Sequence, residues 1–434
     1  MDLRTAGSAG LNLLTATEAA AKIAEGEITS EALVVDCLER IKTRDQDIHA
    51  WKYIDPDGAL EQARACDRAA LPKGPLHGLP IGVKDVLDTH DMPTEYGSSI
   101  YKGNRPAEDS ACVAALRRAG AVILGKTTTT EFASPVPVGV RNPNDLTRTA
   151  GVSSSGSAAA VADFMTPLAN GTQTGGSVIL PAAYCGVVGY KASLDRLDRA
   201  GIQNLKPTLD TLGYFARSIE DIGLVYAALS GDTVPEDPGV PFIGLCRTKH
   251  WDEAEPASQA AVEETAQKLS ESGYAVRDID LPALFQGIEE SFRIISCVEG
   301  VRGMEAEFRD HPDEMNHWLK DMAASGSLWS DDDYRQALAA ATDARNALWP
   351  IFNEVDILLT PSTDGEAPVD LENASVSTFN RIWTLMHGPA MTLPAGEGPD
   401  RMPLGVQLVA RQGEDAKLIA YARQISNLLM EGRE

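Results

Sequence analysis

An α/β fold is the class that the sequence predicts, and two observations carry the prediction. Along most of the chain, segments with the apolar spacing of helices alternate with short apolar runs that are typical of buried strands. The 434 residues contain no internal repeat and no low-complexity linker, so a single domain spanning 1–434 is expected, although this length could hold two or three. With 43% apolar and 23% charged residues, the composition is that of an ordinary globular protein.

Residues 1–70 are expected to form an N-terminal helical layer. Thr15 and Glu18 have the spacing of a capping box, in which two side chains satisfy free N–H groups at a helix start. Helical apolar spacing then continues through "SEALVVDCLERI" up to Ile41. We therefore expect the first strand of the core to come after this layer.

Residues 71–231 are predicted to form the core that carries the site. After the turn formers of "LPKGPLHGLP", Ile81 and Val83 alternate as in a strand and place Lys84 near its end. A helical "SACVAALRRAG", a buried-strand candidate "AVILG" and a turn-rich run over 134–149 follow. This alternation is the pattern of an α/β core.

The rest of the chain divides into a cover and a return to the core. Residues 232–350 hold charged helices such as "SQAAVEETAQKLSESG" and "SDDDYRQALAAATDARNALWPIF", with a short strand in "PFIGLCR", and we expect a helical cover or lid. Residues 351–434 contain the strand candidates "VDILLTPS" and "PLGVQLVAR" and close with the helix "DAKLIAYARQISNLL". Strands far apart in sequence are thus expected to share one sheet.

Charge and cysteine usage exclude several classes of partner. A net charge of −25 gives a negative average field that repels phosphate backbones and anionic lipid headgroups, so we expect neither nucleic acid nor membrane as a partner. The six cysteines have no CxxC spacing and no histidine neighbours that would indicate a metal or redox site, so no metal and no cofactor is expected. Without a secretory leader or a run of 18 apolar residues, the predicted location is cytoplasmic.

Two loops of serine and glycine are the candidates for chemistry. "GVSSSGSAAAVADFM" places Ser153, Ser154 and Ser155 just before a strong helix former, where free backbone N–H groups can face an anion. Helix capping alone would explain one such loop. A second loop, "NGTQTGGSVILPAAYCGVVGY", places Ser177 directly after two glycines, which let backbone N–H groups approach a ligand closely.

A serine nucleophile needs a base, and lysine is the remaining candidate. The seven histidines are scattered and no G-x-S-x-G elbow is present. Lys84 could act if burial kept its amine neutral, because desolvation lowers the pKa of a lysine by several units from about 10.4. Alone, a lysine beside Asp85 is more typical of a solvated surface ion pair, so the serine and lysine positions have to be taken together.

The combination of "GVKD", "GVSSSGSAAAVA" and "GTQTGGSVILPAAYCGVVGYK" resembles the amidase signature family of amide-bond hydrolases. "PVPVGVRNPND", "GYFARSIEDIGL", "PAMTLPAG" and "PLGVQLVAR" extend the similarity over roughly residues 10–430. The resemblance implies one amidase-signature domain with a central mixed β-sheet covered by helices on both sides. It also implies Ser177 as nucleophile, Ser153 as a bridging serine in a cis-peptide setting and Lys84 as base; the serines are 24 residues apart, the family's interval.

These roles are chemically coherent. A neutral Lys84 would draw a proton through Ser153 from Ser177, and the same relay would return it to the leaving amine. The developing oxyanion needs preorganised N–H donors. We assign these donors to the backbone of four adjacent residues, Thr174, Gly175, Gly176 and Ser177. Ser154 and Ser155 are assigned to the surroundings of the relay, where Ser155 and the Thr174 hydroxyl either orient it or make ordinary loop hydrogen bonds.

Four positions depart from the family pattern. Val152 replaces a usual glycine, so either the loop backbone is restricted there or this side chain lines the substrate pocket. Ile179 and Leu180 stand where many relatives carry an arginine that, in malonamidase-like members, pairs with a substrate carboxylate. Its absence counts against small acidic substrates and favours neutral ones. Asn170 stands where an apolar residue is usual, and the sequence alone does not explain it.

The predicted function is hydrolysis of neutral amides, anilides, carbamates (urethanes) or esters through an acyl-enzyme on Ser177. One alternative is a narrow amidase of a ureide or carboxybiuret pathway. Another is the glutaminase subunit of a tRNA-dependent amidotransferase, which would need partner subunits. A third is a non-catalytic binding protein on the same fold. A small-molecule substrate and a monomer or homodimer are expected.

Overall fold

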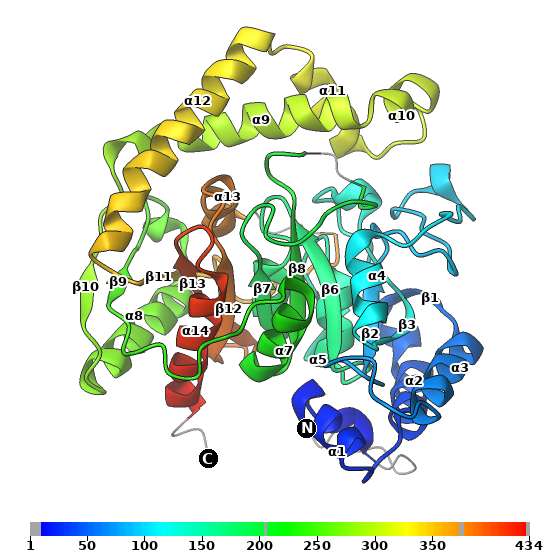
Figure 1. Ribbon diagram of the computed structural model, residues 1–434. Coiled ribbons are helices and arrows are strands. Elements are labelled where there is room, and N and C mark those ends of the chain that lie inside the picture. Colours follow the sequence, from blue (N-terminus) through cyan, green and yellow to red (C-terminus); the bar gives the residue numbers. More distant parts are fainter. Residues whose placement is uncertain (1–9, 204–205, 373–376, 431–434) are drawn as a thin grey trace.

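The centre of the protein is one eleven-stranded mixed sheet in the order β1-β3-β2-β6-β8-β7-β12-β13-β11-β9-β10 (Figure 1). This computed structural model describes residues 10–203, 206–372 and 377–430. The strands of the sheet are β1 (Trp51–Ile54), β2 (Pro80–Lys84), β3 (Val122–Thr127), β6 (Leu168–Gln173), β7 (Val188–Lys191), β8 (Thr211–Ala216), β9 (Ile243–Leu245), β10 (Val276–Asp278), β11 (Ile357–Pro361), β12 (Ala390–Glu397) and β13 (Pro403–Ala410). A separate two-stranded ribbon contains β4 (Arg141–Asn142) and β5 (Asp145–Thr149).

Helices surround this sheet. They are α1 (Ala16–Ala24), α2 (Ser30–Ile48), α3 (Pro56–Asp67), α4 (Ala111–Arg118), α5 (Ser155–Ala162), α6 (Ile179–Cys185), α7 (Ile219–Ser230), α8 (Pro256–Glu271), α9 (Ile288–Gly303), α10 (Glu305–Asp310), α11 (His317–Gly326), α12 (Asp331–Leu348), α13 (Thr378–Leu385) and α14 (Asp415–Met430). Short 3-10 turns are η1 (Leu11–Leu13), η2 (Ser99–Tyr101), η3 (Glu131–Ala133), η4 (Trp251–Glu253), η5 (Ala283–Gly287) and η6 (Trp349–Asn353).

The strand β7 demonstrates that both faces of the sheet are covered. Successive residues of a strand point to opposite faces. The hydroxyl of Tyr190 donates to Asp415 of α14 at 2.6 Å, and its ring meets Tyr226 of α7 edge to face. A Cβ on the preceding Gly189 would instead lie 2.5 Å from Ala182 of α6. The predicted α/β class, with a central mixed sheet and helices on both sides, is therefore confirmed.

The N-terminal layer follows the prediction at its start and differs later. The capping box of Thr15 and Glu18 is present at α1. The helical period up to Ile41 is divided into two helices, because Gly26 takes a φ of +74° and Thr29 caps α2. The layer also contributes β1, which pairs antiparallel with β3 and which the sequence did not predict.

In the segment where a cover was expected, α9, α10, α11 and α12 lie above one end of the strands in Figure 1. Glu299 of α9 fastens this layer to the core: it accepts hydrogen bonds from the Thr208 hydroxyl at 2.7 Å and from the Tyr334 hydroxyl of α12 at 2.7 Å. The earlier part of 232–350 does not belong to the cover, because β9 and β10 extend the central sheet. β9 is the short strand expected in "PFIGLCR", whereas the three residues of β10 carry too little periodicity to be separated from a loop.

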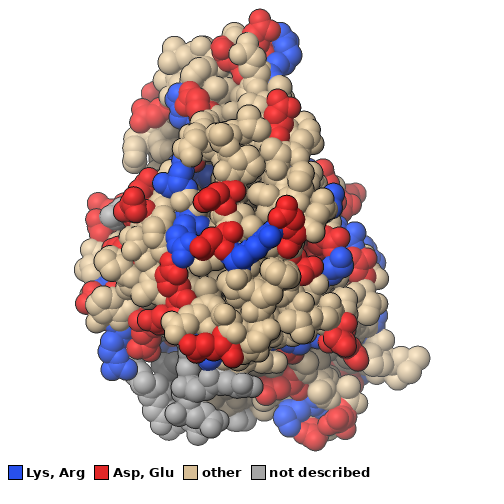
Figure 2. All heavy atoms as spheres, turned by 90° about the vertical axis from the view of Figure 1, so that its left-hand side faces the viewer, with Lys and Arg blue, Asp and Glu red and all other residues tan. Residues whose placement is uncertain are grey.

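The surface agrees with the acidic composition. On the face that Figure 2 shows, acidic and basic side chains are interspersed.

The large main core runs through the sheet and its covering helices, and a second apolar cluster lies beside α9, α12 and α13. No helix within the described ranges is long and apolar enough to cross a membrane.

Candidate active site

Lys84 is the last residue of β2 and is completely buried. Its Nζ lies 2.8 Å from the Ser153 Oγ and 2.9 Å from the Thr172 Oγ1. Thr172 belongs to β6, which runs parallel beside β2, so the sheet brings the two side chains together. The structure thus joins the predicted base to the predicted bridging serine, and it rules out the surface ion pair as an explanation of Lys84.

Burial sets the protonation of this lysine. Because the surroundings disfavour the charged form, burial lowers the pKa of Lys84 to about 7, against a smaller opposing effect of the Asp210 charge. A substantial fraction of the amine is therefore neutral near physiological pH. A neutral amine has a lone pair that accepts a proton from a hydroxyl, which is the chemistry that the relay requires.

The first serine loop is held rigidly at the start of α5. The peptide bond between Val152 and Ser153 is cis, as the resemblance implies. Gly151, and not Val152, takes the left-handed φ of +94°, and a Cβ on this glycine would lie 2.8 Å from the Leu180 side chain. The Ser154 Oγ donates to the Thr172 carbonyl at 3.2 Å and accepts from the Thr172 N–H at 3.3 Å. The loop and β6 are therefore one unit.

The second serine loop is closed by Gln173. The Oε1 of this residue accepts from the backbone N–H of Val178 at 2.9 Å and of Ile179 at 3.1 Å. Its Nε2 donates to the Thr384 Oγ1 of α13 at 3.1 Å. Residues 174–177 form the turn between these anchors, and Ser177 within it is partly exposed. A hydroxyl on a pinned and accessible turn can meet a substrate.

The oxyanion-hole assignment is compatible with this turn. The backbone N–H groups of Thr174, Gly175, Gly176 and Ser177 remain the predicted donors to the substrate oxyanion. Within the described residues, a hydrogen bond connects Lys84 to Ser153, but none is recorded from Ser153 to Ser177. The second step of the relay remains a prediction.

The Thr174 hydroxyl has a partner that the sequence did not identify. It donates to Asp210, which lies just before β8. Burial raises the pKa of Asp210, and the neighbouring Lys206 opposes that shift most strongly. Because the Asp210 charge also raises the pKa of Lys84, this carboxylate connects the nucleophile loop to the base electrostatically.

Two residues of β6 explain what the sequence left open. Asn170 accepts the backbone N–H of Lys84 on its Oδ1 at 2.8 Å, so an amide in place of an apolar residue fixes the end of β2. Thr172 stands two positions further, on the same side of the strand, and reaches the Nζ of that lysine. In "NGTQ", the polar residues Asn170 and Thr172 are two positions apart and so lie on one side of a strand. This pattern points to Lys84 only once β2 is known to be the neighbouring strand.

The other predicted site residues, Ser155, Ile179, Leu180 and Val152, are all buried but have different surroundings. Ser155 is the first residue of α5 and is buried, and its role in orienting the relay remains a prediction. Ile179 and Leu180 pack into two separate apolar clusters. Val152 is also buried, yet it belongs to none of the three clusters found among the described residues. Contact of these three side chains with substrate remains a prediction, best supported for Val152.

A cation near the nucleophile loop comes from outside the local motif. Positions 179 and 180 carry no arginine, but the Cγ of Arg381 lies 3.9 Å from the position of a Cβ on Gly175. Arg381 is on α13, far from the serine loops in sequence. A fold that packs α13 against the nucleophile loop supplies the cation that the local motif lacks.

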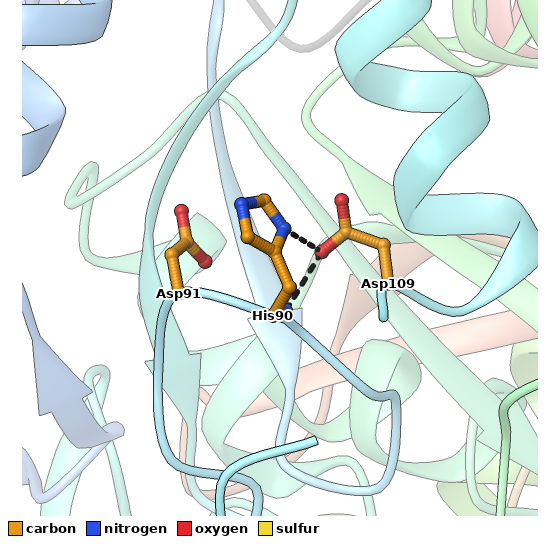
Figure 3. A group of neighbouring side chains, drawn as sticks. All are labelled: His90, Asp91 and Asp109. Carbon is orange, nitrogen blue, oxygen red and sulfur yellow. Dashed lines mark hydrogen bonds and ion pairs between the residues drawn. The ribbon is translucent and has the colours of Figure 1, made fainter. Parts of the chain in front are cut away.

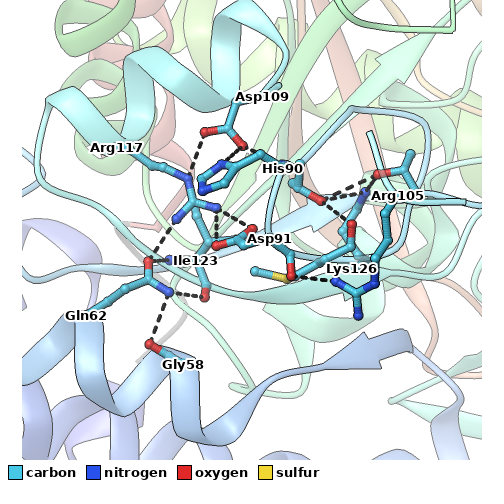
Figure 4. Close-up of polar contacts among 12 residues, drawn as sticks. Gly58, Gln62, His90, Asp91, Arg105, Asp109, Arg117, Ile123 and Lys126 are labelled. Atoms are coloured by element: carbon cyan, nitrogen blue, oxygen red, sulfur yellow. Dashed lines mark hydrogen bonds and ion pairs between the residues drawn. The ribbon is translucent and has the colours of Figure 1, made fainter. Parts of the chain in front are cut away.

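A group of potential metal ligands lies elsewhere, at His90, Asp91 and Asp109 (Figure 3). Arg117 occupies this cluster, since its NH2 donates to the Asp91 carboxylate at 2.7 Å and its Nε lies 3.0 Å from Asp109 (Figure 4). His90 pairs with Asp109 at 2.9 Å through Nδ1. Both carboxylates are thus compensated by a guanidinium, and we interpret the cluster as an ion-pair network.

Comparisons with known proteins identify the family and the fold. A sequence model of the family named Amidase matches residues 32–419. A glutamyl-tRNA(Gln) amidotransferase subunit from Salinispora arenicola is 31% identical, with 96% of this chain and 97% of the relative aligned. A solved structure of an amidase is 30% identical, has a TM-score of 0.88 and matches 97% of this chain and all of that chain, 100%. The peptide amidase of Stenotrophomonas maltophilia is 28% identical with a TM-score of 0.83, covering 96% of this chain and 97% of its own.

Proposed function

The chain belongs to the amidase family, and on that premise we propose that it hydrolyses amide, anilide, carbamate (urethane) or ester bonds through an acyl-enzyme on Ser177. The observation that carries the proposal is the buried Lys84, whose Nζ lies 2.8 Å from the Ser153 Oγ. A lysine with a pKa of about 7 in contact with a serine hydroxyl is able to accept a proton near neutral pH, which supports the role of a base.

The reaction proceeds in two stages. As Ser177 attacks the substrate carbonyl, its proton moves to the Ser153 oxygen and the Ser153 proton moves to Lys84. Backbone N–H groups of 174–177 stabilise the oxyanion, and the leaving amine or alcohol takes the proton back through the same relay. Water, deprotonated by the same route, then attacks the ester on Ser177 and releases the acid.

A substrate panel tests the proposal. Purified protein is assayed with p-nitroanilides, carbamates, primary amides and p-nitrophenyl esters, and the sites modified by an organophosphonate are located by mass spectrometry. We expect turnover of at least one class and a phosphonate adduct on the peptide that holds Ser177. Absence of turnover across the panel, together with labelling only at other residues, would contradict the proposal.

The second candidate is the glutaminase subunit of a tRNA-dependent amidotransferase. It is favoured by the curated relatives, among them the glutamyl-tRNA(Gln) amidotransferase subunits of Salinispora arenicola and Chloroflexus aggregans, the latter 30% identical over 95% of this chain. Its relay chemistry would be the same, with glutamine as the amide. Size-exclusion chromatography and co-purification from the native host distinguish the two: an isolated monomer or homodimer with full activity supports the hydrolase, and an obligate complex supports the amidotransferase.

A further inference from the structure

Arg381 of α13 is a cation that no anion compensates within the described part of the chain. The side chain is partly buried, and its guanidinium lies 6.0 Å from the ring centroid of Phe292 on α9. Over the described ranges, no hydrogen bond or ion pair is recorded for this guanidinium. Other arginines of the core have acceptors: Arg40 pairs with Asp163 at 3.0 Å, and Arg345 donates to the Leu385 carbonyl at 2.9 Å.

The position of Arg381 connects it to the nucleophile loop. Its Cγ lies 3.9 Å from the position of a Cβ on Gly175, and a Cβ on Gly176 would meet the Asn380 side chain of the same helix at 2.4 Å. The Thr384 hydroxyl, one turn further along α13, donates to the Gly175 carbonyl at 3.4 Å. The stem of Arg381 therefore passes beside the predicted oxyanion hole, and its guanidinium lies over the Phe292 ring of α9.

The charges around Arg381 leave it available. Burial lowers the pKa of the guanidinium, and the Glu289 charge opposes this shift. Glu289, however, already accepts from the Lys249 Nζ at 2.5 Å and lies 2.9 Å from the His250 Nε2. A partly desolvated guanidinium is stabilised by a carboxylate, which it binds through two parallel hydrogen bonds. Among the residues that the structure describes, none provides that carboxylate within hydrogen-bond reach.

We propose that Arg381 binds a carboxylate of the substrate, so that the preferred substrates are amides or related acyl compounds that carry an anionic group away from the scissile bond. The inference rests on the proposed hydrolysis at Ser177 and names the substrate class of that site. It replaces the expectation of exclusively neutral substrates, which assumed a site without a cation. The carboxylate belongs either to the acyl part or to the amine part, and paired substrates distinguish these two cases.

The test uses two matched pairs of substrates. Glutaranilic acid and its methyl ester differ by a charge on the acyl side, and 4-acetamidobenzoate and its methyl ester differ by a charge on the amine side. Initial rates of aromatic amine release are measured, so that hydrolysis of the methyl ester itself is not counted and has not yet converted it to the acid. For each pair, the ratio of kcat/KM for the acid to kcat/KM for the ester is measured in the wild type and in Arg381→Met, Arg381→Lys and Arg293→Met. Arg293 is a matched control, since it pairs with Glu290 on α9 at 2.7 Å.

We expect the acid-to-ester ratio of one pair to fall by about 10- to 100-fold in Arg381→Met, the range for a hydrogen-bonded charge pair. Arg381→Lys should recover part of the ratio, because it keeps the charge but loses the bidentate geometry. Arg293→Met should leave the ratio as in the wild type. Equal ratios in the wild type and Arg381→Met for both pairs would overturn the proposal.

A binding measurement separates this inference from the proposed function. Calorimetry of 4-acetamidobenzoate and glutaranilic acid with Ser177→Ala, alone and combined with Arg381→Met, needs no turnover. Weaker binding of an acid in the double variant supports the carboxylate site even if Ser177 proves not to be the nucleophile. Identical binding in both proteins, with Ser177 chemistry intact, would refute the role of Arg381 and leave the proposed function standing.

Discussion

The Nζ of Lys84 lies 2.8 Å from the Oγ of Ser153 although the two residues are 69 positions apart. Both side chains are fully buried, so bulk water does not compete for this hydrogen bond. A lysine in such a place loses most of its preference for the charged form. The Lys84 amine is therefore a suitable proton acceptor for a serine nucleophile.

Loss of the nucleophile should abolish turnover without unfolding the protein. Ser177→Ala removes the covalent route, and we expect kcat to fall by at least about 10³-fold. Because Ser177 is partly exposed, the thermal midpoint should stay close to that of the wild type. Ser258→Ala is the control: it removes the hydrogen bond of a buried serine to the Thr363 carbonyl at 2.7 Å, on α8 and outside the relay. Activity retained in Ser177→Ala would refute the assignment.

The pH profile should report Lys84. Only the neutral amine accepts a proton, and the pKa of about 7 means that the neutral fraction grows as the pH rises through 7. We expect kcat/KM to rise along one acidic limb with a midpoint near this value. Lys84→Ala should remove the limb with most of the activity, whereas Lys191→Gln, at another buried lysine, should keep it. An optimum near pH 5 would contradict a lysine base.

Each of the three proposed relay residues lies in a local motif, so the sequence was enough to propose it, but it missed their partners because those partners are not local. Asn170 and Thr172 meet Lys84 only through the pairing of β6 with β2, and "LANGTQ" has a single β-branched residue, Thr172, and no aromatic residue, so it carries little of the composition that marks most strands. Asp210 reaches Thr174 because β8 pairs antiparallel with β6. Strand pairing over such separations is set by packing of the whole sheet and not by local preference.

The same lysine should make stability depend on pH. The pKa of Lys84 falls from 10.5 to about 7 on burial, so between these values the unfolded chain binds a proton that the folded protein does not. The free energy of unfolding should therefore rise with pH over this window, by up to about 1.4 kcal/mol per pH unit from this group. Urea denaturation of the wild type and Lys84→Met at pH 7 and 9 isolates the contribution, since other groups cancel. Parallel changes in both proteins would show that Lys84 is charged when folded.

Thr172 should tune the base without taking part in the chemistry. Its Oγ1 accepts a hydrogen bond from the Lys84 Nζ at 2.9 Å. This contact favours the ammonium form of Lys84, because the ammonium has one more N–H donor than the neutral amine. Thr172→Val removes this acceptor, so the pKa of Lys84 should fall and the acidic limb of kcat/KM should move to lower pH. Thr172→Ser should restore the wild-type limb. A lower rate with an unmoved limb would indicate a structural role only.

Val152 should set the length of the acyl group that the site accepts. It directly precedes Ser153 and is buried, and we expect its side chain to form a wall of the acyl pocket. Each additional buried methylene of the substrate contributes about 0.8 kcal/mol, and kcat/KM should rise from acetyl toward butyryl anilides until the pocket is full. Val152→Ala enlarges the pocket and should move the preferred chain to a longer acyl group.

The control is Val161→Ala, which truncates a fully buried valine of the main core on α5. It should lower the stability of the protein but leave the preferred acyl length unchanged. If Val152→Ala and Val161→Ala give the same length profile as the wild type, Val152 packs in the protein and another residue bounds the acyl group.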